Sequence, residues 1–150
     1  KGWGGLNIDF IHAKIDMFNI VRKRDKNICA LISDQNEDEK TIFYEHNFSA
    51  VNSLILTEDL KKVLKMKKKM KTVKFENLIN DKFDFLNIDL EGHDYQVLKT
   101  IDLGKYQPRL ICIEILEKSD DKENIFSHMK QNNYKLIKQC KISYLFAKSE

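Results

Sequence analysis

The sequence lacks the cysteine pattern of a disulfide-stabilised or zinc-binding protein. It has three cysteines, Cys29, Cys112 and Cys140, which are odd in number, far apart and set within apolar runs such as LICIEI. Cysteines placed in this way are typical of reduced thiols packed in a protein interior. The pattern argues against a disulfide framework and a structural zinc site, and it favours a reducing, cytoplasmic compartment.

Long apolar runs and charge of a single sign are also missing. No run approaches the roughly 20 residues that a membrane-spanning helix needs, and the first residues, KGWGGLNID, do not resemble a signal peptide. The 26 basic and 23 acidic residues give a formal net charge of only +3, which does not indicate a polyanionic partner. With 150 residues, 42% of them hydrophobic, and one proline, we expect a single domain over residues 1–150, with no membrane span and no nucleic-acid partner.

One local basic run stands out against this balance. Residues 58–71 read EDLKKVLKMKKKMK, with Leu60, Val63, Leu64 and Met70 at spacings that form one apolar stripe of a helix. We therefore predict a solvated helix face or a mobile connector. Nucleic-acid binding is the less favoured alternative.

The chain is organised around the stretch FDFLNIDLEG at residues 83–92. A short apolar run ends there in Asp89 and Glu91, followed by a glycine and then by apolar residues at helical spacing. The pattern predicts a buried strand of a parallel sheet, covered on both faces, an acidic turn and a helix. Because ligands bind outside the carboxyl ends of such strands, the two acids are candidate catalytic residues. The alternative is that Asp94 simply caps the helix and the other two acids are solvated.

The beginning of the chain predicts a parallel crossover unit. A strand at Leu6–Ile8 ends in Asp9, apolar residues then recur at helical spacing up to Val21, and a second strand at Ile28–Ile32 is closed by Ser33 and Asp34. The GWGG segment precedes a strand rather than following one, so we interpret its glycines as turn residues and not as a phosphate loop.

The remaining segments predict strands, a loop and a C-terminal hairpin. Further strands are expected at Thr41–Tyr44 and Leu110–Ile115, and the polar stretch His46–Ser53 predicts a loop. The segments Tyr134–Ile137 and Tyr144–Ala147 form a predicted antiparallel pair. The fold class is therefore α/β, with a mainly parallel sheet that ends in an antiparallel hairpin.

Five segments in this order resemble the successive landmarks of the FkbM-family methyltransferases. They are KGWGGLNID, ALISD at Ala30–Asp34, IFYE at Ile42–Glu45, DFLNIDLEGHDYQVLK at Asp84–Lys99 and KYQPRLICIEI at Lys105–Ile115. The DFLNIDLEG block is the most specific of the five. The resemblance implies a Rossmann-like class I methyltransferase sheet and transfer of a methyl group from S-adenosylmethionine, usually to a sugar hydroxyl in polysaccharide or glycan biosynthesis.

The resemblance also implies roles for individual residues. Asp9 matches the acid that hydrogen-bonds the ribose hydroxyls of the cofactor, and Ser33 and Asp34 match positions near its adenine. Asp89 and Glu91 match the central acidic motif beside the transferred methyl group, where a carboxylate orients and deprotonates an acceptor hydroxyl. Asp89 is thus expected to be both catalytic and cofactor-binding, and the acceptor to be a carbohydrate or another small molecule with a hydroxyl group.

The sequence departs from the family pattern in two places. Phe10 and Ile11 stand where the family has a proline-containing turn, and no strand with a glycine-rich loop precedes Lys1. That first strand would lie in the middle of the sheet and its loop would supply backbone amides to the cofactor. We therefore expect this chain to bind the cofactor weakly. We also expect it to be either a piece of a longer protein or a truncated, inactive copy.

Three other hypotheses stay open. The first is that the chain is a non-catalytic remnant that serves as a binding or interaction module. The second is a nicotinamide-dependent dehydrogenase, since an acid that ends a second strand serves NAD equally well. A third, minority hypothesis is a hard cation held by Asp89, Glu91, His93 and Glu114. Our prediction includes no metal.

Overall fold

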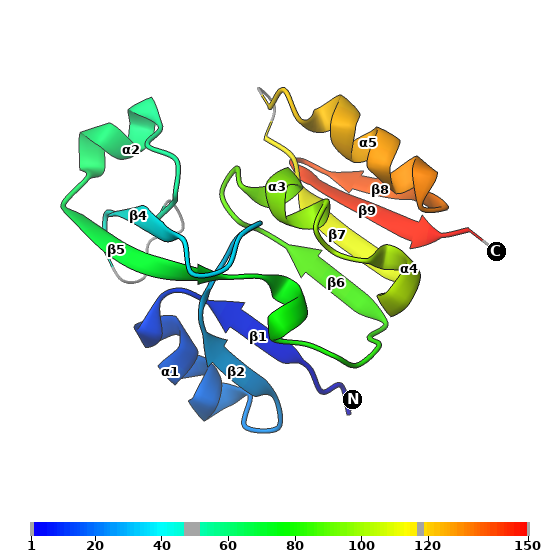
Figure 1. Ribbon diagram of the computed structural model, residues 1–150, viewed down its shortest axis with the longest axis horizontal. Helices are drawn as coiled ribbons and strands as arrows, with labels where there is room; N and C mark the ends of the chain where they lie inside the picture. The colour runs from blue at the N-terminus through cyan, green and yellow to red at the C-terminus, as the bar shows by residue number, and fades with distance from the viewer. Residues whose placement is uncertain (1, 47–51, 117–118, 150) are drawn as a thin grey trace. The chain divides into compact units, whose positions relative to one another are not determined.

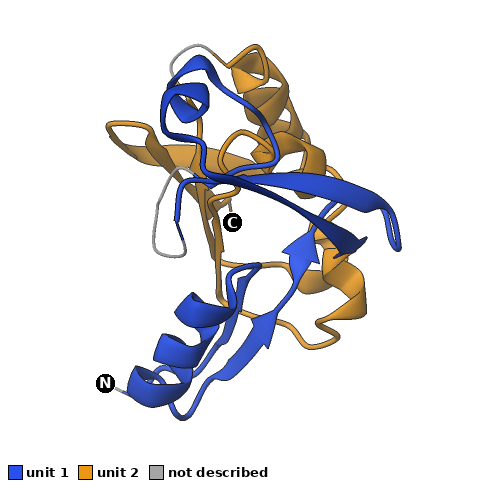
Figure 2. Cartoon of the chain, turned by 90° about the vertical axis from the view of Figure 1, so that its left-hand side faces the viewer, with its two compact units in different colours: residues 1–73 blue, residues 74–150 orange. Residues whose placement is uncertain are grey.

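A computed structural model describes residues 2–46, 52–116 and 119–149 of the chain (Figure 1). The chain divides into two compact units, residues 1–73 and residues 74–150, which are described separately (Figure 2). Most of the loop predicted at residues 46–53 lies outside the described residues.

Unit 1 begins with the predicted crossover. Strand β1 (Leu6–Asp9) leads into helix α1 (His12–Val21) and then into strand β2 (Lys26–Cys29). The two strands are parallel, with Asp9 opposite Cys29. The predicted parallel crossover from β1 through α1 to β2 is therefore confirmed.

The strand predicted at Ile28–Ile32 is wrong as a single element. The structure has two pieces there, β2 and the short β3 (Leu31–Ile32), separated by Ala30. β2 pairs with β1, whereas β3 pairs in parallel with β5 (Met66–Val73). The chain therefore passes from one sheet to the next at Ala30.

The basic run is a short helix followed by a strand, so the prediction of one helix face or a connector is wrong for its second half. Helix α2 (Glu58–Val63) ends before β5, and β5 pairs antiparallel with β4 (Glu39–Tyr44). Alternate lysines of β5 find acidic partners near β4, with Lys69 2.7 Å from Glu39 and Lys71 2.8 Å from Glu37. The strand period places these lysines on one face, because side chains alternate along a strand.

Unit 2 contains a four-stranded sheet in the order β6-β7-β9-β8. Its strands are β6 (Phe85–Ile88), β7 (Leu110–Glu114), β8 (Tyr134–Cys140) and β9 (Ser143–Lys148). β6 and β7 are parallel, while β7/β9 and β8/β9 are antiparallel. The predicted C-terminal hairpin is confirmed.

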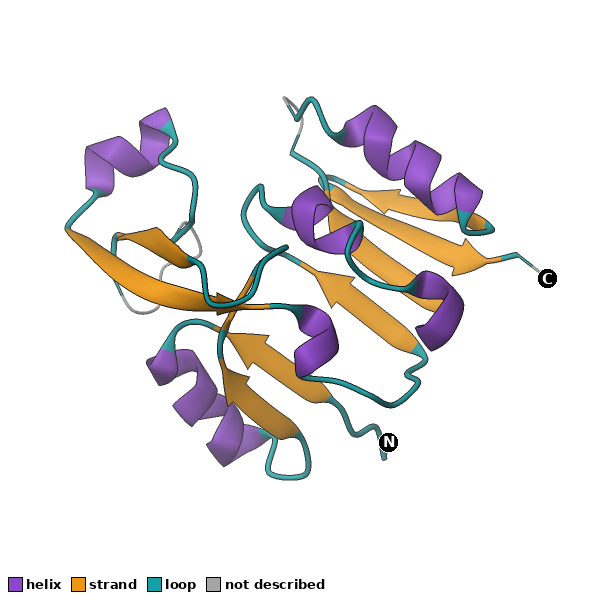
Figure 3. Cartoon of the chain, in the orientation of Figure 1, coloured by secondary structure: helices purple, strands orange, loops and turns teal. Residues whose placement is uncertain are grey.

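The helical elements of unit 2 leave one side of β6 open. They are the 3-10 turn η1 (Phe75–Asn77) and the helices α3 (Asp94–Leu98), α4 (Leu103–Tyr106) and α5 (Lys122–Gln131). Helices α3, α4 and α5 lie over the same face of the sheet (Figure 3). Along β6, buried Leu86 and Ile88 alternate with exposed residues, and Phe85 is 42% exposed. The prediction that both faces of β6 are covered is therefore wrong.

The described sheets are mixed rather than mainly parallel. Three strand pairs are parallel, β1/β2, β3/β5 and β6/β7, and the other three are antiparallel. The α/β class is confirmed, but a single, mainly parallel sheet is not. Among the described residues, no helix has both the length and the apolar character needed to cross a membrane.

Candidate active site

The turn after β1, residues 9–11, is organised by Asp9 itself and is called the Asp9 turn. One carboxylate oxygen, Oδ1, accepts the Ile11 N–H at 2.8 Å, and the other, Oδ2, lies 3.4 Å from the Lys14 ammonium. The side chain remains 21% exposed. Since a carboxylate has about four lone-pair sites, Asp9 can accept further hydroxyl donors without breaking the turn.

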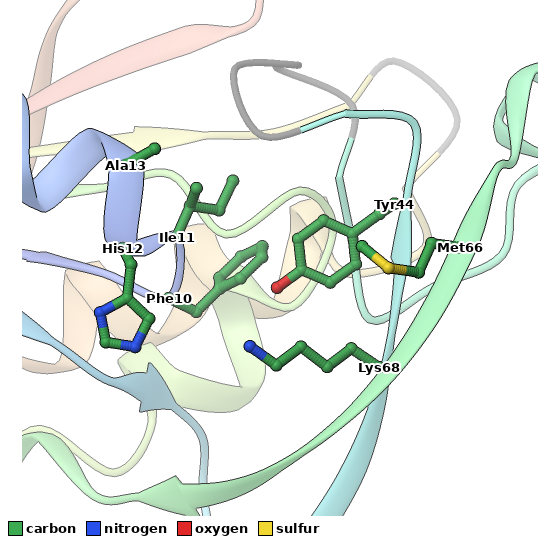
Figure 4. Close-up of a pocket in the computed structure, with 7 residues that line it drawn as sticks. All are labelled: Phe10, Ile11, His12, Ala13, Tyr44, Met66 and Lys68. Carbon is green, nitrogen blue, oxygen red and sulfur yellow. The ribbon is translucent and has the colours of Figure 1, made fainter.

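A pocket of about 190 Å³ adjoins this turn (Figure 4). It is lined by Phe10, Ile11, His12, Ala13, Tyr44, Met66 and Lys68. The rings of Phe10 and Tyr44 meet edge to face at 5.9 Å, and Lys68 extends its amine toward the space between His12 and Tyr44 (Figure 4). Pockets that enclose a drug-sized ligand measure roughly 300 to 1,000 Å³, so this one suits part of a ligand, such as a planar ring.

The charge of Asp9 acts on two neighbouring groups. Burial raises the pKa of the Tyr44 hydroxyl, and the nearby Cys29 and Asp9 raise it further. Burial likewise raises the pKa of the Cys29 thiol, with Asp9 as the next contribution. Both groups are therefore neutral at pH 7, and the Tyr44 hydroxyl keeps its proton for hydrogen bonding.

Ser33 and Asp34 follow β3 in the same unit. Ser33 is fully buried, its N–H donates to the Val73 carbonyl at 3.1 Å, and its hydroxyl donates to the Asp34 carboxylate at 3.0 Å. The structure thus couples these two residues to each other at the carboxyl end of β3. Their contact with adenine stays a prediction.

The turn after β6, residues 89–94, is called the acid loop. Two consecutive residues in it have positive φ, Glu91 at 51° and Gly92 at 92°. Glycine tolerates this conformation, whereas for another residue it costs about 1–2 kcal/mol. Contacts with neighbouring groups must therefore stabilise the positive φ of Glu91.

Asp94 provides that support. Asp94 is only 5% exposed. Its Oδ1 accepts the Leu90 N–H and its Oδ2 accepts the Gly92 N–H, both at 3.0 Å. Burial raises the pKa of this carboxyl most, the backbone hydrogen bonds oppose that rise, and nearby Asp89 adds to it. The sequence suggested only a helix cap, but Asp94 turns back to bind the loop before the helix.

Asp89 and Glu114 lie at equivalent positions at the carboxyl ends of the neighbouring parallel strands β6 and β7. Ile88 is opposite Ile113 in the β6/β7 register, so the next residue on each strand lies at the same edge of the sheet. Burial raises the pKa of the Glu114 carboxyl, and the charges of Asp89 and Asp94 raise it further. The three carboxylates therefore share one electrostatic environment.

The hypothesis of a bound cation gains no support from the described side chains. Among residues 2–46, 52–116 and 119–149, no three His, Cys, Asp or Glu side chains converge as metal ligands do. The predicted site residues fall into two groups, with Asp9, Ser33 and Asp34 in unit 1 and Asp89 and Glu91 in unit 2. A crevice shared by Asp9 and Asp89 thus stays a prediction.

Comparison with known families identifies the family of this chain. The FkbM methyltransferase domain matches residues 2–136. The chain belongs to the FkbM methyltransferase family. Searches of curated proteins and of solved structures found no match. The catalytic and binding roles of the acids at the ends of β1 and β6 stay predictions.

Proposed function

We propose that this FkbM-family protein transfers a methyl group from S-adenosylmethionine to a hydroxyl group of a carbohydrate or other small acceptor, in polysaccharide or glycan biosynthesis. The observation that carries the proposal is the position of Asp89, at the carboxyl end of β6 and beside Glu114 at the end of β7. This is the edge at which ligands bind in α/β sheets. A carboxylate among other carboxylates there is suited to accept a proton.

Methyl transfer to a hydroxyl group requires the protein to align the two reactants and to supply one proton acceptor. When bound, S-adenosylmethionine supplies an electrophilic methyl group: the hydroxyl oxygen bonds to its carbon as the S–C bond breaks, and sulfur keeps that electron pair as a neutral thioether. Asp89 accepts the hydroxyl proton and releases it to water afterwards. Glu91, on the same loop, orients the acceptor.

The Asp9 turn fits the cofactor's nucleoside. Asp9 retains acceptor sites for two vicinal ribose hydroxyls beyond its bonds to Ile11 and Lys14. The adjoining pocket, with Phe10 and Tyr44 in its wall, suits the flat adenine ring. Ser33 and Asp34 are assigned to the adenine on the family pattern.

A purely structural role for Asp9 is the competing interpretation, because its carboxylate already holds the Asp9 turn. A structural cap and a ligand-binding acid respond differently to substitution. Removing a cap mainly lowers the melting temperature, whereas removing a ligand contact mainly weakens cofactor binding.

The test is methyl transfer itself. The chain is incubated with S-adenosylmethionine carrying an isotope-labelled methyl group and with a panel of hexoses, deoxyhexoses and short oligosaccharides. Mass spectrometry then looks for a labelled O-methyl sugar, with the Asp89→Asn variant as the control. We expect the label in at least one sugar with the wild-type chain and far less with the variant.

A second arm detects weak binding. Titration with S-adenosylhomocysteine, followed by NMR, is expected to shift the backbone amide signals of Phe10 and Asp34. No shift at either residue, together with no labelled sugar, contradicts the proposal.

A further inference from the structure

The acid loop contains a buried carboxylate that the proposed mechanism does not use. Asp94 is 5% exposed, and both of its oxygens are committed to backbone N–H groups within the loop. Buried carboxylates are costly unless they are hydrogen-bonded. The bonds to Leu90 and Gly92 therefore explain how the loop tolerates this charge.

Each of those two bonds is made by the peptide N–H that follows one of the two proposed catalytic acids. The Leu90 N–H follows Asp89 directly, and the Gly92 N–H follows Glu91 directly. The one Asp94 carboxylate thus holds the peptide group that joins Asp89 to Leu90 and the peptide group that joins Glu91 to Gly92. It also holds Glu91 at a φ of 51°, a conformation that an unsupported loop leaves readily.

We propose that Asp94 is a positioning residue of the active site, whose carboxylate fixes the backbone of the acid loop and so holds the Asp89 and Glu91 side chains toward the reacting hydroxyl. This inference rests on the proposed function. Alignment of reacting groups is worth a great deal in catalysis, and a displacement of about 1 Å costs as much as a hundredfold in rate. Asp94 itself touches neither acceptor nor cofactor in this account.

Asp94→Asn is the informative variant because it keeps the shape of the side chain. The amide retains one oxygen acceptor, but its NH₂ group faces a backbone N–H, so one of the two bonds to the loop is lost. The matched control is Asp102→Asn. Asp102 is exposed and also accepts a backbone N–H, that of Lys105 at 2.8 Å, but it caps α4 and does not lie in the acid loop.

We expect Asp94→Asn to lower kcat by about ten- to a hundredfold, with the Kd for S-adenosylhomocysteine within twofold of wild type. Asp102→Asn is expected to change neither. The double variant Asp89→Asn/Asp94→Asn separates positioning from general destabilisation: if Asp94 acts through Asp89, adding the second change costs little further activity. Two independent defects that multiply in full contradict the positioning role.

Hydrogen exchange of the wild-type chain tests the anchor without any variant. The Leu90 and Gly92 amides are expected to exchange more slowly than unprotected amides, and fast exchange of both overturns the inference. The two proposals fail separately. If the wild-type chain methylates no sugar, the proposed function fails and the role of Asp94 with it. If the wild-type chain transfers methyl groups and Asp94→Asn does so at the same rate, only the positioning role fails.

Discussion

The Asp9 turn and the acid loop both follow a parallel strand and precede a helix, yet they hold their acids by different means. In the Asp9 turn one carboxylate is both the strand-end acid and the anchor, because Asp9 itself accepts the Ile11 N–H. In the acid loop the two tasks are divided. Asp94 anchors the backbone, and Asp89 occupies the end of the strand.

The two turns also differ in the charges around them. Asp9 has the Lys14 ammonium 3.4 Å away, whereas Asp89 adds to the raised pKa values of Asp94 and Glu114. The Lys14 ammonium is a second partner of the Asp9 carboxylate beside the Ile11 N–H, which suits a group that binds by hydrogen bonds. Neighbouring carboxylates favour proton uptake, which suits a general base. The proposed mechanism gives binding to Asp9 and proton transfer to Asp89, and this difference in surroundings is in keeping with that proposal.

The largest effect is expected from Asp89→Asn. The variant keeps the side-chain shape but removes the proton acceptor, and loss of a general base costs roughly a hundred- to ten-thousandfold. Methyl transfer to the best sugar acceptor, measured at saturating cofactor, checks this. Turnover close to wild type would remove Asp89 from the mechanism.

The next effect concerns the backbone of the acid loop. Gly92→Ala places a Cβ on a residue with a φ of 92°, so we expect the free energy of unfolding to fall by about 1–2 kcal/mol. Gly5→Ala is the matched change just before β1, where the added Cβ has nothing within 4 Å and no positive φ to strain it. Denaturant unfolding of both variants checks the pair; equal losses would mean that the acid loop is not under a special backbone constraint.

A smaller effect follows from the raised pKa of Glu114. A carboxyl whose folded-state pKa lies above its ordinary value of 4.5 stabilises the fold below that value, and this contribution is lost as the pH rises through the folded-state pKa. Glu114→Gln removes a carboxyl group whose charged form is disfavoured in the folded state by partial burial and by the charges of Asp89 and Asp94. Its melting temperature should therefore exceed that of wild type at pH 7 but not at pH 4. A difference that does not depend on pH would contradict the electrostatic environment that Glu114 shares with Asp89 and Asp94.

The smallest effect is expected from Lys14→Met at the Asp9 turn. The ion pair with Asp9 is partly exposed, and such pairs contribute about 0–1 kcal/mol to stability. Thermal unfolding at low and high salt checks this, since screening should bring the variant and wild type closer together. A loss well above 1 kcal/mol would show that Asp9 is mainly a structural group.

Much of this arrangement could be predicted from local patterns. The apolar runs that end in Asp9 and Asp89 place β1 and β6 correctly, the strand predicted at Leu110–Ile115 is one residue longer than β7, and the helical spacing before Val21 gives α1. These signals are local because burial of one face imposes a period on neighbouring residues.

The rest depends on contacts between distant segments. β5 is a strand because β4 pairs with it, bringing Glu37 and Glu39 beside lysines some 30 residues later, and no period within the lysine run shows this. The anchoring role of Asp94 was missed for a similar reason. It depends on the path of the loop through Glu91, where a positive φ at a non-glycine residue leaves no mark in the sequence.

The division of labour between the two acids is tested most directly by titration of S-adenosylmethionine into the wild-type, Asp9→Asn and Asp89→Asn chains, followed by NMR, with the methyl-transfer rate of each at saturation. Loss of charge-assisted hydrogen bonds should weaken cofactor binding to Asp9→Asn by about 1–3 kcal/mol, with a rate close to wild type. Asp89→Asn should bind normally and turn over slowly. Equal losses of affinity and rate in the two variants would contradict the account.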